Sequence, residues 1–249
     1  MTLPQRERLS LGSAELDTMM GGGLIKGSAT LVSGAPGVGK TTLGLQFLIA
    51  GIELGQTGLM VSFEEFPASL IRDAMQLGWD LKALEKAGQF GIIFTSPEIF
   101  LESLKAGEVG PIAEKIRTLS PDRIVIDSAS HFQRLTDDTM ELREIYNTLV
   151  NAMKRQDMTS LLLDEALNVL KAQRGRMASL PFVVDTVLLL RYVEVDSSIQ
   201  RAIAVMKMRG SAHQKEIRRF NIKQGGLQLG DPFTGREGIL SGMTHRTVQ

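Results

Sequence analysis

Short apolar runs alternate with longer amphipathic segments over the first two thirds of the chain. Five runs of five or six residues, rich in aliphatic and β-branched side chains, predict buried strands at 29–33, 58–63, 90–95, 123–127 and 159–163. The segments between them predict helices at 40–54, 67–77, 108–118 and about 138–155. Strands and helices that alternate at these spacings predict right-handed crossovers and an α/β fold with a mostly parallel sheet.

The pattern changes after residue 180. Three strand-like segments, 183–194, 201–208 and 216–223, follow one another without a helix between them. They predict antiparallel strands that extend the sheet at its end. The glycine-rich tail from residue 225 predicts a loop with a short strand. No break in composition divides the chain, so we expect one domain over residues 1–249.

The strongest chemical signal directly follows the first predicted strand. Residues 34–42 read Gly-Ala-Pro-Gly-Val-Gly-Lys-Thr-Thr and fit G-x-x-x-x-G-K-[ST] between a strand and a helix, which is the context that this motif requires. The glycines let successive backbone N–H groups point at phosphates, and the start of the helix adds the positive end of its dipole. Lys40 would bridge the β- and γ-phosphates, and Thr41 would offer its hydroxyl to Mg²⁺. The expected cofactors are therefore ATP and Mg²⁺, with nucleotide contacts from Gly34, Gly37, Val38, Gly39, Lys40, Thr41 and Thr42.

Carboxylates follow two other predicted strands. Asp127 ends the strand 123–127, and ligands of open α/β sheets bind at the carboxyl ends of strands, so Asp127 is expected beside Thr41 as a magnesium ligand through water. Glu64 and Glu65 directly follow the strand 58–63 and could polarise a water for attack on the γ-phosphate. From these residues alone, a charged turn into the next helix is an equal alternative.

Composition narrows the classes of function. In the 249 residues, 28 Lys and Arg balance 28 Asp and Glu, which excludes a globally basic nucleic-acid coat and an acidic tail. The absence of cysteine excludes a disulfide scaffold, a thiolate metal site and a cysteine nucleophile. No apolar run approaches the roughly 20 residues that span a bilayer, and the first residues lack the apolar centre of a secretory signal. We therefore expect a cytoplasmic location and no membrane partner.

Together these motifs resemble the KaiC-like branch of the RecA-type ATPases. The most specific parts are the paired glutamates at 64 and 65 and the pattern K-x-R-G-S-x-H at 207–213. The resemblance implies a RecA-like fold and Mg²⁺-dependent ATP hydrolysis. It also implies a homo-oligomeric ring, expected to be a hexamer, that acts on an unknown protein partner. It extends over nearly the whole chain, from Leu16 and the Gly21–Gly23 turn to residues 231–242.

The resemblance also implies residue roles. Glu64 becomes the general base with Glu65 as its partner, and the metal ligands are Thr41, Asp127 and Glu64. The strand end at 207–213 is implied to reach the nucleotide of the neighbouring subunit. Because residues i and i+2 of a strand share a face, Lys207 and Arg209 could point at one triphosphate, although an exposed basic strand is the plainer alternative. The residues implied at this shared site are Lys207, Met208, Arg209, Ser211 and His213.

Binding of single-stranded nucleic acid by a RecA-like ATPase remains an alternative activity. The candidate loops follow the fourth and fifth core strands, at 131–134 and 171–176. Lys171, Arg174 and Arg176 could contact phosphates there. One basic loop in a neutral chain is a small electrostatic footprint, so this alternative is possible but not favoured.

Serine/threonine autokinase activity is a further alternative. Autophosphorylated members of the family carry adjacent Ser and Thr where this chain has Pro181 and Phe182, and neither of these can accept a phosphate. Another hydroxyl would have to take that part. The candidates by sequence region are Ser179, Thr186, Ser197 and Ser198.

Overall fold

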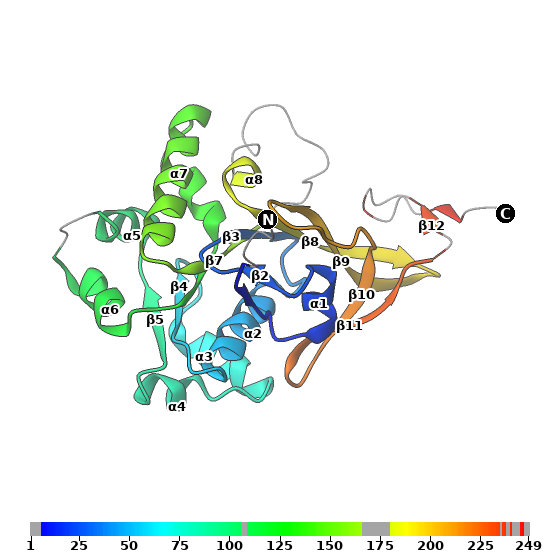
Figure 1. Cartoon of the computed structure of the whole chain (residues 1–249), viewed down its shortest axis with the longest axis horizontal. Helices are drawn as coiled ribbons and strands as arrows, with labels where there is room; N and C mark the ends of the chain where they lie inside the picture. Colours follow the sequence, from blue (N-terminus) through cyan, green and yellow to red (C-terminus); the bar gives the residue numbers. More distant parts are fainter. Residues whose placement is uncertain are drawn as a thin grey trace, which may run out of the picture.

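The computed structural model describes residues 6–105, 109–165, 180–234, 236–237, 240 and 245–246. A nine-stranded sheet passes through the molecule in the order β11-β10-β9-β8-β3-β7-β6-β4-β5 (Figure 1). Strands β3, β7, β6, β4 and β5 are mutually parallel, which confirms the predicted α/β fold with a mostly parallel sheet. These strands match the predicted ones to within one residue. Their bounds are β3 (Ala29–Gly34), β4 (Gly58–Ser62), β5 (Phe90–Phe94), β6 (Arg123–Asp127) and β7 (Thr159–Asp164).

Alternate residues of the central strands face two separate cores. On β6, Val125 packs into one apolar cluster, whereas Ile124 and Ile126 pack into another. The first cluster is closed by α2 and α3, and the second by α5, α6 and α7, so helices cover both faces of the sheet (Figure 1). The bounds of these helices are α2 (Lys40–Ile52), α3 (Pro67–Gln76), α5 (Pro97–Ser103), α6 (Pro111–Leu119) and α7 (Thr139–Arg155).

The predicted antiparallel extension is confirmed from β9 outward, whereas the first strand of this group, β8, pairs parallel with β3. The strand expected from residue 183 begins at Thr186, because residues 180–183 form the short helix α8 (Leu180–Val183). Asp196 and Ser197 have φ of 50° and 58°, as a tight hairpin turn between right-twisted strands requires. The tail after residue 225 forms a longer strand than expected, since it pairs with β10. The strands are β8 (Thr186–Val195), β9 (Ser198–Met208), β10 (Arg218–Lys223) and β11 (Gly226–Pro232).

Several short elements have no counterpart among the predicted ones, because they are too brief to show a clear hydrophobic period. Local signals nevertheless start three of the short helices, since the side chains of Ser13, Asp80 and Ser96 accept backbone N–H bonds as N-caps. The additional elements, together with α5 and α8, are β1 (Arg8–Leu9), α1 (Ala14–Met19), β2 (Leu24–Ile25), α4 (Leu81–Lys86), η1 (Ala129–Arg134), β12 (Arg236–Glu237) and β13 (His245–Arg246).

A buried arginine fixes β6 against α2. The guanidinium of Arg123 donates to the carbonyl of Phe47 at 2.8 Å and to the amide oxygen of Gln56 at 2.7 Å, and burial lowers the pKa of Arg123 to about 10. A Cβ at Gly51 would lie 2.3 Å from Nε of Arg123, so only glycine fits there. Arg123 begins the strand that Asp127 ends, so this anchor also sets the position of Asp127.

The register of the sheet brings four strand ends to one edge. Ser33 pairs with Asp164, Asp127 pairs with Leu163, and Ser62 pairs with Asp127. The ends of β3, β7, β6 and β4 therefore meet, and the predicted site residues lie there.

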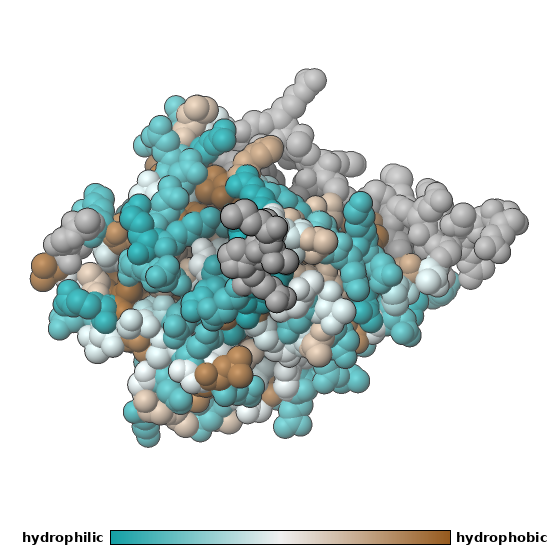
Figure 2. All heavy atoms as spheres, viewed as in Figure 1, coloured by the Kyte–Doolittle hydropathy of each residue, from teal (hydrophilic) through white to brown (hydrophobic). Residues whose placement is uncertain are grey.

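Polar side chains dominate the face of the molecule seen in Figure 2, where apolar residues appear as small, separate areas. Within the described residues, no helix combines the length and the apolar composition that crossing a membrane would require.

Candidate functional site

The loop between β3 and α2 has the backbone that phosphate binding requires. Gly37 and Gly39 have φ of 74° and 116°, in the left-handed region where L side chains are strained. A Cβ at Gly34 would lie 2.5 Å from the carbonyl oxygen of Leu190 on β8. The loop therefore depends on glycine for its turns and for its close packing against the sheet. The tip of the loop is also bound to β8, because the hydroxyl of Tyr192 on that strand donates to the Gly37 carbonyl at 2.6 Å.

Lys40 holds a positive charge inside this loop. Its ammonium group donates to the carbonyl oxygens of Gly34 at 3.0 Å and Ala35 at 3.1 Å, and the side chain is buried. Burial lowers the pKa of Lys40, and the nearby carboxylates of Glu165 and Asp127 act in the opposite direction. A cation at the start of a helix, surrounded by loop N–H groups, is suited to binding a polyphosphate.

Thr41 and Asp127 meet as the sequence predicted. The hydroxyl of Thr41 donates to Oδ2 of Asp127 at 2.6 Å, although 86 residues separate them in the chain. Burial raises the pKa of Asp127, and the hydrogen bond from Thr41 and the charge of Lys40 lower it. A hydroxyl and a carboxylate side by side are the hard oxygen ligands that Mg²⁺ prefers, so these residues fit a magnesium ion bound beside the phosphates.

Glu64 and Glu65 lie in the turn between β4 and α3. The turn is closed by Ser62, whose hydroxyl accepts from the Glu65 N–H at 3.1 Å and donates to the Glu65 carbonyl at 2.8 Å. Burial, and then the charge of Asp127, raise the pKa of Glu65. Both glutamates line one hollow with Thr41 and Asp127, so the structure brings the predicted carboxylates to the phosphate-binding loop.

Two further carboxylates at this edge escaped the sequence reasoning. Asp164 is buried at the end of β7 and accepts from the Ser130 hydroxyl at 2.9 Å. The N–H of Glu165 donates to the same hydroxyl at 2.8 Å, and Glu165 lines the hollow with Glu64. Burial raises the pKa of Asp164. A strand followed by a carboxylate is the same signal that identified Asp127, so the pair could have been found in this way.

The end of β9 and the residues that follow it lie at the other end of the strands, away from the edge where the phosphate-binding loop lies. Leu190 of β8 pairs with Gly34, whereas Met208 pairs with Thr186 at the other end of β8. Because four residues of a strand span about 13 Å, Lys207 and Arg209 do not meet the phosphate-binding loop of their own chain. Ser211 and His213 follow them at the same end.

At that end of the strands the two cations bind the α8 segment. Lys207 donates to the carbonyls of Pro181 at 2.8 Å and Val184 at 2.7 Å, and Arg209 donates to the carbonyl of Phe182 at 2.7 Å. Burial has the largest effect on the pKa of Lys207 and lowers it, and the positive charge of Arg209 lowers it further. A role for these residues at a nucleotide therefore requires a second subunit.

The residues expected for the alternative activities are only partly described. Residues 171–176 and Ser179 lie outside the described part of the chain. Residues 131–134 belong to η1, and Thr186 is buried at the start of β8. Ser197 and Ser198 lie at the hairpin between β8 and β9.

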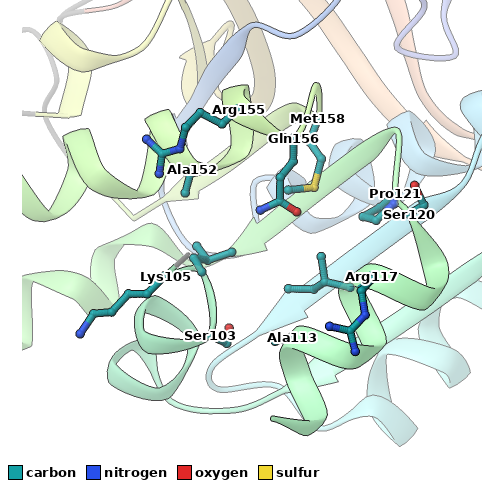
Figure 3. Close-up of a pocket in the computed structure, with 12 residues that line it drawn as sticks. Ser103, Lys105, Ala113, Arg117, Ser120, Pro121, Ala152, Arg155, Gln156 and Met158 are labelled. Carbon is teal, nitrogen blue, oxygen red and sulfur yellow. The ribbon is translucent and has the colours of Figure 1, made fainter. Parts of the chain in front are cut away.

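Another hollow lies at the opposite edge of the sheet (Figure 3). Pro121 precedes β6 and Met158 precedes β7, so this hollow is remote from the phosphate-binding loop. Of its cations, Arg117 and Arg155 lie in the last turns of α6 and α7, and Lys105 follows the end of α5; their charged groups lie apart from one another (Figure 3). Cations are favoured at helix C-termini, which accounts for them without a ligand.

Comparisons with known proteins match most of the chain to one protein family. The family model described as "ATPase: KaiC" matches residues 9–232. The chain is 36% identical over 243 residues to circadian clock protein KaiC3 of Synechocystis sp., covering 97% of this chain and 47% of that protein. It is 35% identical over 252 residues to circadian clock oscillator protein KaiC of Thermostichus vulcanus, covering 99% of this chain and 47% of that protein. The chain thus spans about half the length of these curated relatives.

Proposed function

The chain belongs to the KaiC family of ATPases, and from this premise we propose that it is a Mg²⁺-dependent ATP hydrolase. The contact between Thr41 and Asp127 carries the proposal, because it places a hydroxyl and a carboxylate beside a complete phosphate-binding loop. The mostly parallel sheet with its antiparallel strands is a RecA-like phosphate-loop fold, and residues 1–249 would act as one ATPase unit.

Each site residue then has one task. Lys40 and the loop N–H groups bind the β- and γ-phosphates, and Thr41 and Asp127 hold Mg²⁺, which would neutralise charge on the phosphate oxygens. Glu64 removes a proton from a water as its oxygen bonds to the γ-phosphorus. The bond from that phosphorus to the bridging oxygen breaks, and ADP leaves with the electron pair. Glu65, whose pKa is raised by burial, lies beside the reacting water as the partner of Glu64.

The Asp127→Asn variant tests the magnesium assignment. We expect about a 10- to 100-fold rise in the Mg²⁺ concentration needed for half-maximal ATP turnover, the usual cost of losing a residue that supports a metal ion through water. A titration of turnover against Mg²⁺ measures this shift. Asp157→Asn is the matched control, since Asp157 is exposed in a turn with φ of 54°, which asparagine adopts readily. An unchanged magnesium requirement in Asp127→Asn would remove Asp127 from the site.

We further propose that the active site is completed between subunits of a ring, expected to be a hexamer. The position of Lys207 and Arg209 at the edge opposite the phosphate-binding loop supports this arrangement. A head-to-tail interface joins opposite faces of identical subunits and closes into a ring when the rotation allows it. The two cations would then stabilise the transition-state charge on the neighbour's triphosphate.

A mixing experiment tests whether the site is shared. Glu64→Gln subunits lack the base but carry Arg209, and Arg209→Ala subunits lack the cation but carry Glu64. Each variant alone should be nearly inactive, whereas a one-to-one mixture should recover about one quarter of wild-type turnover, because a quarter of the interfaces then combine two intact halves. Turnover equal to the sum of the separate activities would mean that each chain completes its own site. Arg117→Ala, which changes an exposed cation on α6, should keep wild-type turnover.

A ring also predicts specific activity that rises with protein concentration and then saturates. The hexameric state, the protein partner and the cytoplasmic location stay predictions. Neither nucleic-acid binding nor autokinase activity is favoured by any contact among the described residues.

A further inference from the structure

The general base proposed above contacts a side chain to which neither the motifs nor the family match gives a role. Nε2 of His131 lies 3.0 Å from Oε2 of Glu64. The side chain of Glu64 is 72% exposed, whereas that of His131 is 8% exposed. An exposed carboxylate in a turn has several accessible rotamers, so a donor at a fixed position would select among them.

The imidazole of His131 is such a fixed group. Its ring packs edge-on against Phe63, with 6.0 Å between the ring centroids. The backbone N–H of His131 donates to the backbone carbonyl of Ser128 at 3.2 Å, and this bond fixes the backbone of His131 within η1. The next residue, Phe132, is fully buried and also packs edge-on against Phe63, at 5.3 Å. Both the backbone and the ring of His131 are therefore held by packing that does not involve Glu64.

We propose that His131 is a positioning residue that holds the carboxylate of Glu64 toward the phosphate-binding loop. This inference rests on the proposed role of Glu64 as general base. His131 and Glu64 line the same hollow as Thr41 and Asp127, so the contact draws Glu64 toward the place where the γ-phosphate would lie. With Nε2 protonated, His131 donates to Oε2, and Oε1 accepts the proton of the attacking water.

The inference predicts a loss of turnover without a loss of binding. His131→Leu keeps an apolar side chain but removes the donor, and we expect kcat to fall about 10-fold, as for the loss of one hydrogen bond to a charged group, with KM for ATP nearly unchanged. His131→Gln should recover most of the turnover, because its amide nitrogen is a donor of similar reach. Arg134→Ala is the control, since it changes an exposed side chain of the same element, η1, without removing the packing that holds His131, and it should not reproduce the fall in kcat.

A double-mutant cycle separates positioning from general structural damage. In the Glu64→Gln background, adding His131→Leu should change kcat by less than about two-fold, because the carboxylate that His131 orients is gone. A 10-fold loss in both backgrounds, or no rescue by glutamine, would overturn the inference. Wild-type kcat in His131→Leu beside an inactive Glu64→Gln overturns the inference alone. Full turnover by Glu64→Gln overturns it together with its premise.

A spectroscopic measurement covers the case in which His131→Leu does not fold. The chain has three histidines, so the ring nitrogen resonances of His131 can be assigned by their loss in His131→Gln. Glu64→Gln should shift these resonances and leave those of His213 in place. Resonances of His131 that do not move would overturn the inference.

Discussion

Replacing Lys40 with alanine is expected to weaken ATP binding on the order of 100-fold, or about 3 kcal/mol, because hydrogen bonds to charged groups contribute about 1.5–3 kcal/mol each. Lys40 is buried inside the loop, where its charge is poorly screened by water, and its ammonium group lies within reach of two loop carbonyls. In the proposed complex those donors turn to the β- and γ-phosphates. Equilibrium binding of ATP, followed by calorimetry, measures the loss.

The control for this variant is Lys82→Ala, which removes an exposed lysine on α4 and should leave ATP affinity unchanged. In the proposed ring, bound nucleotide contacts two neighbouring subunits. Lys40→Ala should therefore also reduce ATP-driven assembly, measured by light scattering. Wild-type affinity in Lys40→Ala would show that the loop does not bind the phosphates as proposed, whatever the fate of the other site residues.

The parallel half of the fold and half of the site could be predicted from local patterns. Each central strand is buried on both faces, so its sequence is a short, continuous apolar run that stands out from the amphipathic helices. The carboxyl ends of parallel strands must meet at one edge, so Asp127 could be placed beside Thr41 without knowing the distance between them. The strand that ends at Asp164 carries the same signal, so Asp164 could be placed at this edge as well.

The rest of the site depends on contacts that no local pattern carries. His131 reaches Glu64 across 67 residues, and Tyr192 reaches Gly37 across 155 residues. By sequence, His131 belongs to the loop at 131–134, a candidate for contact with nucleic acid because it follows the fourth core strand. Its partner is set by the packing of η1 against Phe63, and that packing is a property of the tertiary structure.

The positions of Lys207 and Arg209 illustrate a different limit. Their motif is read from the sequence, and its place at the end of β9 is confirmed. What the motif does cannot follow from one chain, since the register of β8 and β9 places it at the edge away from the loop. The role in trans therefore stays a prediction that the mixing experiment decides.

Replacing Glu64 with glutamine should lower kcat for ATP hydrolysis by about 10²- to 10⁴-fold, the usual contribution of a general base. Glutamine has nearly the same shape and can still contact His131, but its neutral amide cannot take the proton from water. ATP affinity should stay near that of the wild type, because the phosphate contacts come from the loop and Lys40. Single-turnover hydrolysis measures the chemical step, and equilibrium binding provides the control.

Glu65→Gln serves as the matched comparison, since Glu65 is the neighbouring carboxylate in the same turn and its pKa is raised by burial. A severe loss in Glu65→Gln together with full turnover in Glu64→Gln would transfer the role of base to Glu65. A severe loss confined to Glu64→Gln would place the base on the carboxylate that His131 holds.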